Sequence, residues 1–569
     1  MRRWIGALVA ALALMSCTPA GTTPPGGGAS QTDRTASQPR STEIKRIRAT
    51  ILADPTMLVD RLTPGAIPGI VEVEPLLSPG LTSVDDRGSS RLVLAEAAPT
   101  LENGLWKVLP DDRMETTWRI NPKARWHDGT PVTSADVVFT WRVENDREVP
   151  MRRNIAVGLV DAVEAPDPFT VIVSWKNLYT EADALFRGAL FPRHLLETPY
   201  LEEKAAFTNL PYFSADFVGS GPFELKQFVR SSHLILAAHE SYVLGKPKID
   251  EIEIKFIPDG NAVVANILAG SVELTLGRSV ALEQFVALRD QWREGGVDIA
   301  VSGWVLIFPQ FLNPDPSVVL ELPFRRALMH ALDRQQMADS LQAGLVPLAD
   351  TFVHPNEPEY RDIERSIVRH PYDVRQSIQL IEGLGYTRAP DGFFRDRNNA
   401  RLTIDIRTGG AEISNKATFT VADYWKLAGV DTEPMVMPEQ RRNQDREWVQ
   451  NFPGFLMYRQ PNAPSEWVTR LHSTQTPLPE NNYFGRNHSR YMNADLDGLI
   501  DKFYRTIPKA ERMQLLGQIV HHTTDQLNTM GLVFDAEPIA VGRRLKNIAA
   551  TKATGSTPAW NAEQWDLGS

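Results

Sequence analysis

Strand-like and helix-like patterns alternate along the chain from Glu43 onwards, without a long linker or a repeat of fixed period. In residues 249–257, IDEIEIKFI, apolar and charged residues alternate as they do in a half-buried strand. From Met513 to Met530, apolar residues recur every three or four positions, which predicts an amphipathic helix. Because 569 residues exceed one core of ordinary size, we expect an α/β body of two or three lobes interleaved in sequence.

Two further helices are predicted from their ends. Asp259 or Asn261 is suited to cap a helix that runs through Leu268, and Gly270 follows at its C-terminal end. Residues 324–341 carry apolar side chains at helical spacing and stop before Gly344, which predicts one helix.

The N-terminus has the pattern of a processing signal. Two arginines precede the apolar run from Trp4 to Met15, which is too short to span a bilayer. Residues 14–17, LMSC, resemble the lipobox of bacterial lipoproteins and end in Cys17. We therefore expect residues 1–16 to be a signal peptide and residues 17–42 an acylated Cys17 with a Gly/Pro/Ser-rich tether. The alternative is an ordinary signal peptide with an incidental cysteine.

Charge and cysteine usage exclude two classes of protein. The formal net charge is −10, and nucleic-acid binding would favour a basic surface. Cys17 is the only cysteine, so the mature body cannot depend on internal disulfides and must be stabilised by its core.

The stretch ARWHDGTPVTSADVVFTW, residues 124–141, places His127 beside Asp128 and raises the question of catalysis. Gly129 and Pro131 favour a turn, and Thr133 followed by Asp136 forms a capping-box pattern at the start of a helix. A strand end, a turn and a capped helix explain the stretch without an active site.

Other candidate chemistry has little support. Ser220 lies between two glycines in VGSGP, but no GxSxG motif or neighbouring base accompanies it, so a turn is favoured. His521, His522 and Asp525 share one predicted helix, where His521 and Asp525 are four residues apart. A solvated helix face is the simpler interpretation, and neither HExxH, CxxC, a P-loop nor GxGxxG occurs. We expect that the protein is not an enzyme and that it binds neither a metal ion nor a cofactor.

Several segments together resemble the family 5 extracellular solute-binding proteins, the substrate receptors of ABC importers. TTWRINPKARWHDGTPVTSADVVFTW resembles the signature segment of the family, and GSGPFELKQF resembles its G-T-G-P-Y/F strand turn. YVLGKPKIDEIEIKFIPDGNAVVANILAGSVEL follows a third family segment, with Glu273 where aspartate is usual, and LPFRRALMHALDRQQMADSL follows a fourth, with Leu322 replacing aspartate. YDVRQSIQLIEGLGY and NNYFGRNHSRYMNADLDGLID match two later landmarks, so the resemblance covers about Arg46 to Asn547.

The resemblance implies a large periplasmic-binding-protein-like fold of type II, cluster C, with three interleaved lobes, a hinge and a ligand cleft between lobes. By analogy, lobe I combines residues 43–87, 215–300 and 530–569. Lobe II comprises residues 88–214 and lobe III residues 301–529. Two lobes would close on a solute without making or breaking a bond.

The resemblance also directs attention to one segment of lobe III. Peptide-binding members have a W-x-A-D-Y-x-x-P segment whose aspartate holds the α-amino group of the ligand. The counterpart here is GFLMYRQPNAPSEW, which contains no aspartate and has Arg459 near the expected position. A guanidinium there would repel an ammonium group and suit a carboxylate or other anion.

We expect the ligand pocket to be walled by a small set of aromatic and polar side chains, although core packing explains each aromatic residue equally well. The set is Trp304, Gln310, Phe455, Tyr458, Arg459 and Tyr483.

The function expected from the resemblance is capture of a peptide-like or other small organic solute, anionic solutes included, for the permease subunits of an ABC importer. The protein would be an extracytoplasmic monomer, lipid-anchored on the outer face of the cell membrane or in the periplasm, with no nucleic-acid partner. One alternative is a surface lipoprotein that reuses the fold for signalling or adhesion. An oligosaccharide or nickel-chelate receptor is a further alternative.

Overall fold

The computed structural model describes residues 44–63 and 67–568. The expected signal peptide, Cys17 and the whole of the expected tether lie outside the described residues. Residues from Ile44 onwards form one compact unit, which contains every element discussed below.

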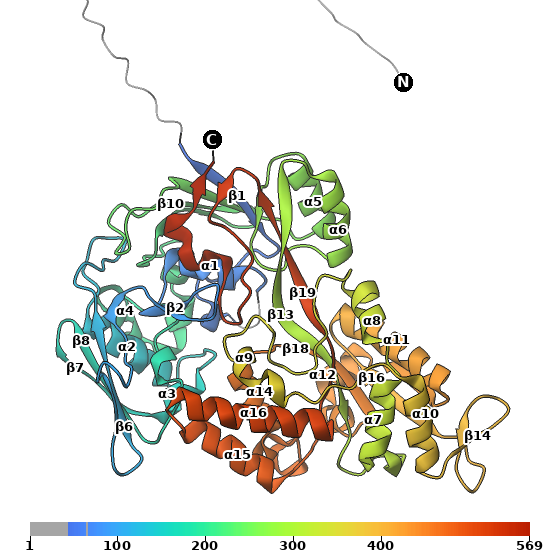
Figure 1. The fold of residues 1–569 in the computed structure, drawn as a ribbon. Helices are drawn as coiled ribbons and strands as arrows, with labels where there is room; N and C mark the ends of the chain where they lie inside the picture. The colour runs from blue at the N-terminus through green and yellow to red at the C-terminus, as the bar shows by residue number, and fades with distance from the viewer. Residues whose placement is uncertain (1–43, 64–66, 569) are drawn as a thin grey trace, which may run out of the picture. The chain divides into compact units, whose positions relative to one another are not determined.

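A ten-stranded sheet forms the centre of this unit (Figure 1). Its strands, in spatial order, are β17 (Asp431–Val436), β16 (Thr403–Thr408), β18 (Phe455–Gln460), β13 (Gly295–Pro309), β19 (Met530–Gly542), β12 (Leu274–Thr275), β1 (Arg46–Ile51), β11 (Glu251–Phe256), β10 (His233–Ala238) and β9 (Phe223–Val229). We call β12, β1, β11, β10 and β9 the β1 half, and β17, β16 and β18 the β16 half.

The long strands β13 and β19 join the two halves. They pair antiparallel from Gly295 opposite Gly542 to Ile307 opposite Met530. The register shifts between Val301 and Trp304 and again after Val305, as it does at a β-bulge. We call this irregular region, residues 301–305 and 533–537, the junction.

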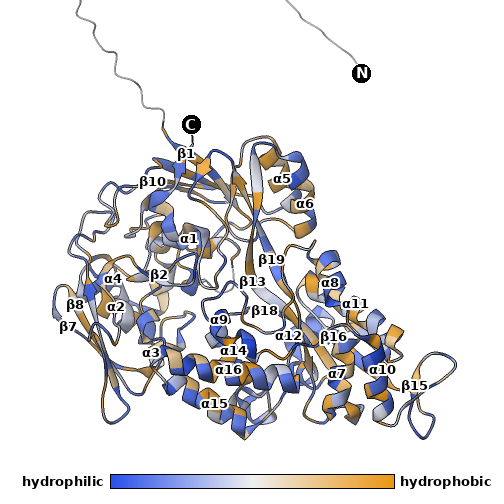
Figure 2. Ribbon diagram, viewed as in Figure 1, coloured by the Kyte–Doolittle hydropathy of each residue, from blue (hydrophilic) through white to orange (hydrophobic). Residues whose placement is uncertain are grey.

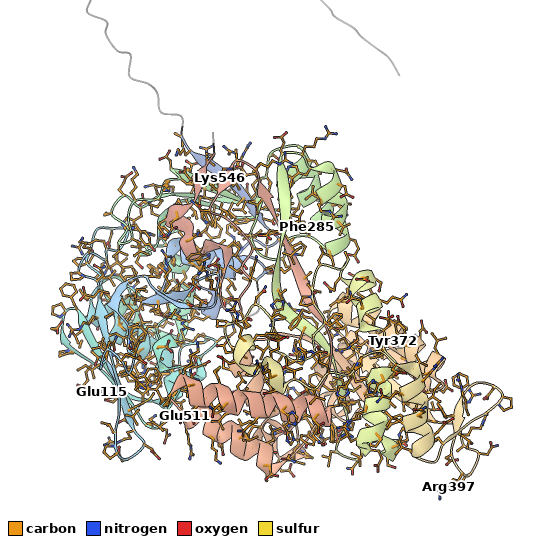
Figure 3. All side chains as sticks on the ribbon, in the orientation of Figure 1. Glu115, Phe285, Tyr372, Arg397, Glu511 and Lys546 are labelled. Atoms are coloured by element: carbon orange, nitrogen blue, oxygen red, sulfur yellow. The ribbon has the colours of Figure 1, made fainter. Side chains whose placement is uncertain are left out.

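Helices cover both halves of the sheet. The β1 half has α1 (Ile70–Leu77), α5 (Gly260–Leu268), α6 (Leu282–Gln291) and the 3₁₀ helix η9 (Pro558–Gln564). Phe285 of α6, labelled in Figure 3, is buried against α5. The β16 half and its surroundings have α7 (Leu322–His330), α8 (Arg334–Leu341), α9 (Tyr360–Ile363), α10 (Val374–Gly383), α11 (Glu412–Ala428), α12 (Glu439–Gln444), α13 (Arg446–Gln450), α14 (Pro464–Leu471), α15 (Ala494–Arg505) and α16 (Lys509–Gln526).

A second sheet has its own core. It contains β4 (Ala95–Ala97), β6 (Met114–Ile120), β8 (Thr170–Trp175), β7 (Val160–Asp167) and β5 (Trp106–Val108), and it packs with α2 (Ser134–Asn145), α3 (Ile155–Leu159) and α4 (Arg193–Glu202) nearby. Trp118, Trp126 and Trp175 are fully buried in this core. The smaller hairpins are β2 (Thr82–Val84) with β3 (Ser90–Leu92), β14 (Thr387–Arg388) with β15 (Phe394–Arg395), and β20 (Leu545–Lys546) with β21 (Asp566–Leu567).

Most of the elements expected from local pattern are present. The alternating segment 249–257 contains β11, and the periodic segment 508–531 contains α16, on which hydrophobic and hydrophilic residues alternate (Figure 2). Asp259 caps α5 by accepting a hydrogen bond from the Ala262 amide at 2.8 Å.

The helix expected over residues 324–341 is wrong in one respect. The structure breaks it into α7 and α8, and Asp333 caps the second helix by accepting from the Gln336 amide at 2.9 Å. An internal cap residue allowed the break, because its side chain replaces the helical hydrogen bonds that are lost there. The mixed α/β class is confirmed, and the lobe bounds stay a prediction.

Candidate functional site

Five of the six expected pocket residues lie on or next to two paired strands. β13 carries Trp304 and is followed by Gln310, and β18 carries Phe455, Tyr458 and Arg459. In the antiparallel register, Trp304 lies opposite Gln460 and Val305 lies opposite Arg459. Tyr483 comes from a separate loop after the 3₁₀ helix Pro479–Asn481, where its hydroxyl donates to Glu447 at 2.7 Å.

Arg459 belongs to an ion-pair cluster at the junction. Its Nε donates to Oδ2 of Asp535 on β19 at 2.9 Å, and Arg278 donates to the same oxygen at 2.6 Å. The Asp535 side chain is 4% exposed, whereas the side chain of Arg278 is 47% exposed. Gln342 at the end of α8 lies 3.4 Å from the other carboxylate oxygen. The charge of Arg459 is therefore already balanced by a carboxylate within the protein.

A cavity of about 110 Å³ adjoins this cluster. Both halves of the sheet contribute to its wall, with Arg278 and Glu283 from the β1 half and Gln342 and Lys416 from the β16 half. Lys416 of α11 reaches Glu283 of α6 at 2.6 Å, so an ion pair also links the two halves. Charges of both signs thus surround the cavity, which suits a polar or zwitterionic group better than a purely apolar one.

Two further acidic side chains, Glu72 and Glu537, lie near one another. Burial and the neighbouring charge of Glu537 raise the pKa of Glu72 on α1 from 4.5 to about 7. The Glu72 carboxylate also lies close to the turn after β12, where a Cβ placed on Gly277 would be 2.8 Å from its Oε2. An acidic group therefore lies beside the turn that precedes Arg278.

Trp304 is buried in the core and is not exposed on a surface. Its ring makes an edge contact with Trp467 at 5.0 Å between centroids and packs near Phe352. Among residues 44–63 and 67–568, the indole N–H groups of Trp304 and Trp467 have no hydrogen-bond acceptor. A buried N–H without an acceptor is costly, so burial of these two rings carries a polar penalty.

The structure places Gln310 and Phe455 in structural roles. The Gln310 amide donates to the carbonyls of Gln450 and Phe452, and its oxygen accepts from the Leu312 amide. Phe455 is fully buried against Trp425 at 5.0 Å between centroids. Tyr458 is half-buried beside His488, and burial raises its pKa to about 12. Only Arg459 of these residues belongs to the charged cluster.

The cluster around His127 forms a scaffold. Nδ1 of His127 accepts from the Gly219 amide at 3.1 Å, and Nε2 lies 3.2 Å from the Gly221 carbonyl. Asp128 pairs with His194 at 2.6 Å instead of with His127. Burial lowers the pKa of His127 to about 3, so its ring is neutral at physiological pH.

The expected capping box at the start of α2 is confirmed. Oδ2 of Asp136 accepts from the Thr133 amide at 2.8 Å.

Ser220 and the histidines of α16 do not assemble a reaction centre among the described contacts. Ser220 is 1% exposed, and both ring nitrogens of the nearby His127 are engaged by backbone groups. Asp525 pairs with Arg326 at 2.6 Å, whereas His522 bonds to Tyr491. Within residues 44–63 and 67–568, no group of three His, Cys, Asp or Glu side chains is placed to hold a metal ion. In the same described part, no helix is long and apolar enough to cross a membrane.

The arrangement of the fold is shared with solved solute-binding proteins. An oligopeptide-binding protein from Thermotoga maritima superimposes with a TM-score of 0.74 at 16% identity, covering 92% of this chain and 99% of that one. This likeness confirms the mixed α/β, multi-lobed solute-binding fold.

Sequence comparison defines the family. Residues 96–474 match the model of the bacterial extracellular solute-binding proteins, family 5, so the chain belongs to this family. It is 24% identical over 379 residues to the oligopeptide-binding protein AppA of Bacillus subtilis, covering 64% of each chain, which is less than two thirds of that relative. It is 23% identical over 447 residues to heme-binding protein A of Haemophilus influenzae, covering 73% of this chain and 76% of that one.

Sequence reasoning missed the partners of Arg459. Asp535 stands in the largely apolar run GLVFDAEPIAV, which also contains Glu537, and a carboxylate in a buried strand was the available signal. Arg278 follows the short strand β12, and no sequence pattern around it indicates a role in an ion pair. Both residues are far from Arg459 in sequence, so only the folded sheet brings them together.

Proposed function

We propose that this protein is the solute receptor of an ABC importer and that it captures a peptide-like or other small organic solute between the two halves of its sheet. Family membership is the observation that carries the proposal. The solute would enter beside the junction, and movement about β13 and β19 would then enclose it and exclude water. The named relatives bind oligopeptides and heme, so the family tolerates different solutes on one fold.

The charges at the junction narrow the chemical class of the expected ligand. A free guanidinium at Arg459 would select an anion, but Asp535 already accepts from Arg459 and Arg278. A solute with both a donor and an acceptor group can complement this pair without leaving a charge unbalanced. We therefore propose a zwitterionic or mixed polar solute at the junction, with Tyr458 and Arg459 near it and Trp304 behind them.

The N-terminal features extend the proposal to the cell surface. Acylation of Cys17 after removal of residues 1–16 would tether the receptor beside its permease, and residues 17–42 would give it reach. Cys17→Ala should release the protein from the membrane fraction without changing solute affinity. Mass spectrometry of the mature N-terminal peptide measures the acyl groups directly.

The test of the central proposal begins with the solute that accompanies the purified protein. Mass spectrometry of the denatured sample should identify it, and the same compound should raise the melting temperature of solute-free protein saturably. Small-angle scattering should show compaction on binding. A protein that carries no solute and responds to no peptide, amino acid, oligosaccharide or chelate in a broad screen contradicts the proposal.

A further inference from the structure

A second cavity, of about 190 Å³, lies beside α1 and away from the ion pairs of the junction. Its wall includes Glu74, Pro75 and Ser78 of the α1 region, Ser83 of β2, Arg187 and Trp560. A water occupies about 30 Å³ in the liquid, so the space corresponds to roughly six waters or a solute of similar size. We call this space the α1 cavity.

Three polar atoms on this wall have no hydrogen-bond partner within the part of the chain that the structure describes. They are Oγ of Ser78, Oγ of Ser83 and Nε of Arg187. Ser78 is 1% exposed, so its hydroxyl has been removed from bulk water without compensation. Buried hydroxyl and guanidinium groups are normally bonded, and leaving one unbonded costs about 1–3 kcal/mol. Because all three groups can donate hydrogen bonds, their position around one cavity indicates a binding site for a ligand with hydrogen-bond acceptors.

Backbone contacts bring the three residues to the same place. The Leu81 amide donates to the Phe186 carbonyl at 2.8 Å, which ties the segment containing Ser78 and Ser83 to the segment containing Arg187. Gly80 permits this approach, because a Cβ there would lie 2.2 Å from the Phe186 carbonyl oxygen. The hydroxyls and the guanidinium therefore line one wall that is held in place by the backbone.

The acidic residues of the wall are already engaged. Asp60 lies 2.8 Å from Arg152, and Glu74 accepts hydrogen bonds from the amides of Asp60 and Ala189. Arg187 has a looser partner, since its nearest carboxylate, on Asp183, is 3.5 Å away. Arg187 is the cation among the described residues of the wall, and its longer contact with Asp183 leaves its guanidinium able to bind a second anion.

We propose that the α1 cavity binds the carboxylate of a small organic acid, with Arg187, Ser78 and Ser83 as donors and with Trp560 and Pro75 against its carbon skeleton. A guanidinium beside hydroxyl groups matches a carboxylate in both charge and hydrogen-bond direction. The aromatic and proline faces supply apolar area for a short chain or ring. The proposal goes beyond the proposed receptor function, because the α1 cavity shares no lining residue with the cavity at the junction and would be a second binding site.

The test compares acids with the matching amides, which lack the carboxylate charge, on the full-length protein. Propionate, succinate, benzoate and L-alanine are titrated by calorimetry at millimolar concentration, alongside propionamide, succinamide, benzamide and alaninamide. At least one acid should bind saturably, and its amide should bind at least tenfold more weakly. Arg187→Gln should raise the Kd of that acid at least tenfold, and Ser78→Ala should raise it severalfold while the melting temperature of the solute-free protein stays equal or rises.

Two matched variants separate binding from general damage. Thr82→Val removes another fully buried, unpartnered hydroxyl that does not line the cavity, and it should leave the Kd unchanged. Arg187→Lys keeps the charge but loses the planar fork, and it should retain part of the affinity if Arg187→Gln fails to fold.

Equal affinity in wild-type, Ser78→Ala and Arg187 variants overturns the α1 proposal and leaves the receptor function standing. The same holds if no acid binds but a co-purified solute binds all variants equally. If neither acids nor any other solute binds, both proposals fail.

Discussion

Arg459 and Asp535 are joined across the sheet, with Nε of the arginine 2.9 Å from Oδ2 of the aspartate, and Arg278 donates to the same oxygen at 2.6 Å. One buried carboxylate therefore organises two guanidinium groups from different parts of the chain. Because β19 connects the two halves of the sheet, this cluster couples the junction to both of them. A solute bound at the junction, as proposed, would meet a preformed charge pair and not an isolated cation.

Removal of Asp535 should destabilise the protein more than removal of either arginine. Asp535→Asn leaves two guanidinium groups without their carboxylate, and we expect a loss of about 2–4 kcal/mol, reduced from a fully buried pair because Arg278 is partly exposed. Arg459→Gln should cost less, since Arg278 still pairs with Asp535. Urea unfolding measures both values. Arg113→Gln breaks an exposed pair with Asp111 and should leave the free energy of unfolding unchanged. An equal loss in all three variants would refute the special role of Asp535.

Glu72 should make the protein less stable as the pH rises. Its pKa is about 7 in the folded state and 4.5 in the reference state, so the folded state binds the extra proton. The stabilisation is complete below pH 4.5 and is lost as the pH rises through 7. Because the side chain is only half-buried, we expect wild-type stability to fall by on the order of 1–2 kcal/mol relative to Glu72→Gln over this range. A difference between the two proteins that is constant with pH would contradict this assignment.

His127 should make the protein less stable as the pH falls, which is the opposite of the effect expected for Glu72. Burial lowers its pKa from 6.5 to about 3. Between these two pH values the unfolded chain is protonated at His127, whereas the folded protein is not. Stability is fully present above pH 6.5 and is lost as the pH falls toward 3, by at most about 1.4 kcal/mol per pH unit. His127→Gln, which keeps hydrogen-bonding capacity without titrating, should flatten this dependence in acid unfolding curves. An unchanged slope would mean that other groups dominate acid unfolding.

Gly219 should not accept any side chain. A Cβ at this position would lie 1.9 Å from the Leu77 carbonyl oxygen, a backbone atom that cannot move aside without shifting the end of α1. We expect Gly219→Ala to cost about 3 kcal/mol or more. The matched control is Gly383→Ala in α10, where open space surrounds the new methyl group and helix propensity should add about 0.5–1 kcal/mol of stability. Thermal unfolding of the two variants should therefore move in opposite directions.

Local pattern was sufficient for elements whose signals are short in range. The Asp259 cap of α5, the alternation in β11 and the period of α16 all depend on residues within a few positions of one another. The helix over residues 324–341 was wrong for the same reason, because periodicity continues across the break that Asp333 caps. Similarity to family segments then supplied the class of fold, which periodicity cannot supply.

The sequence by itself determined the family, the class of fold and the non-catalytic interpretation of the segment around His127. Only the tertiary structure decided what surrounds Arg459: its side chain pairs with Asp535, 76 positions away, beside Arg278. It also brought Ser78, Ser83 and Arg187 to one cavity. The physical reason is that charge balance and cavity shape arise from contacts between segments distant in sequence, whereas helix and strand patterns reflect the surroundings of neighbouring residues.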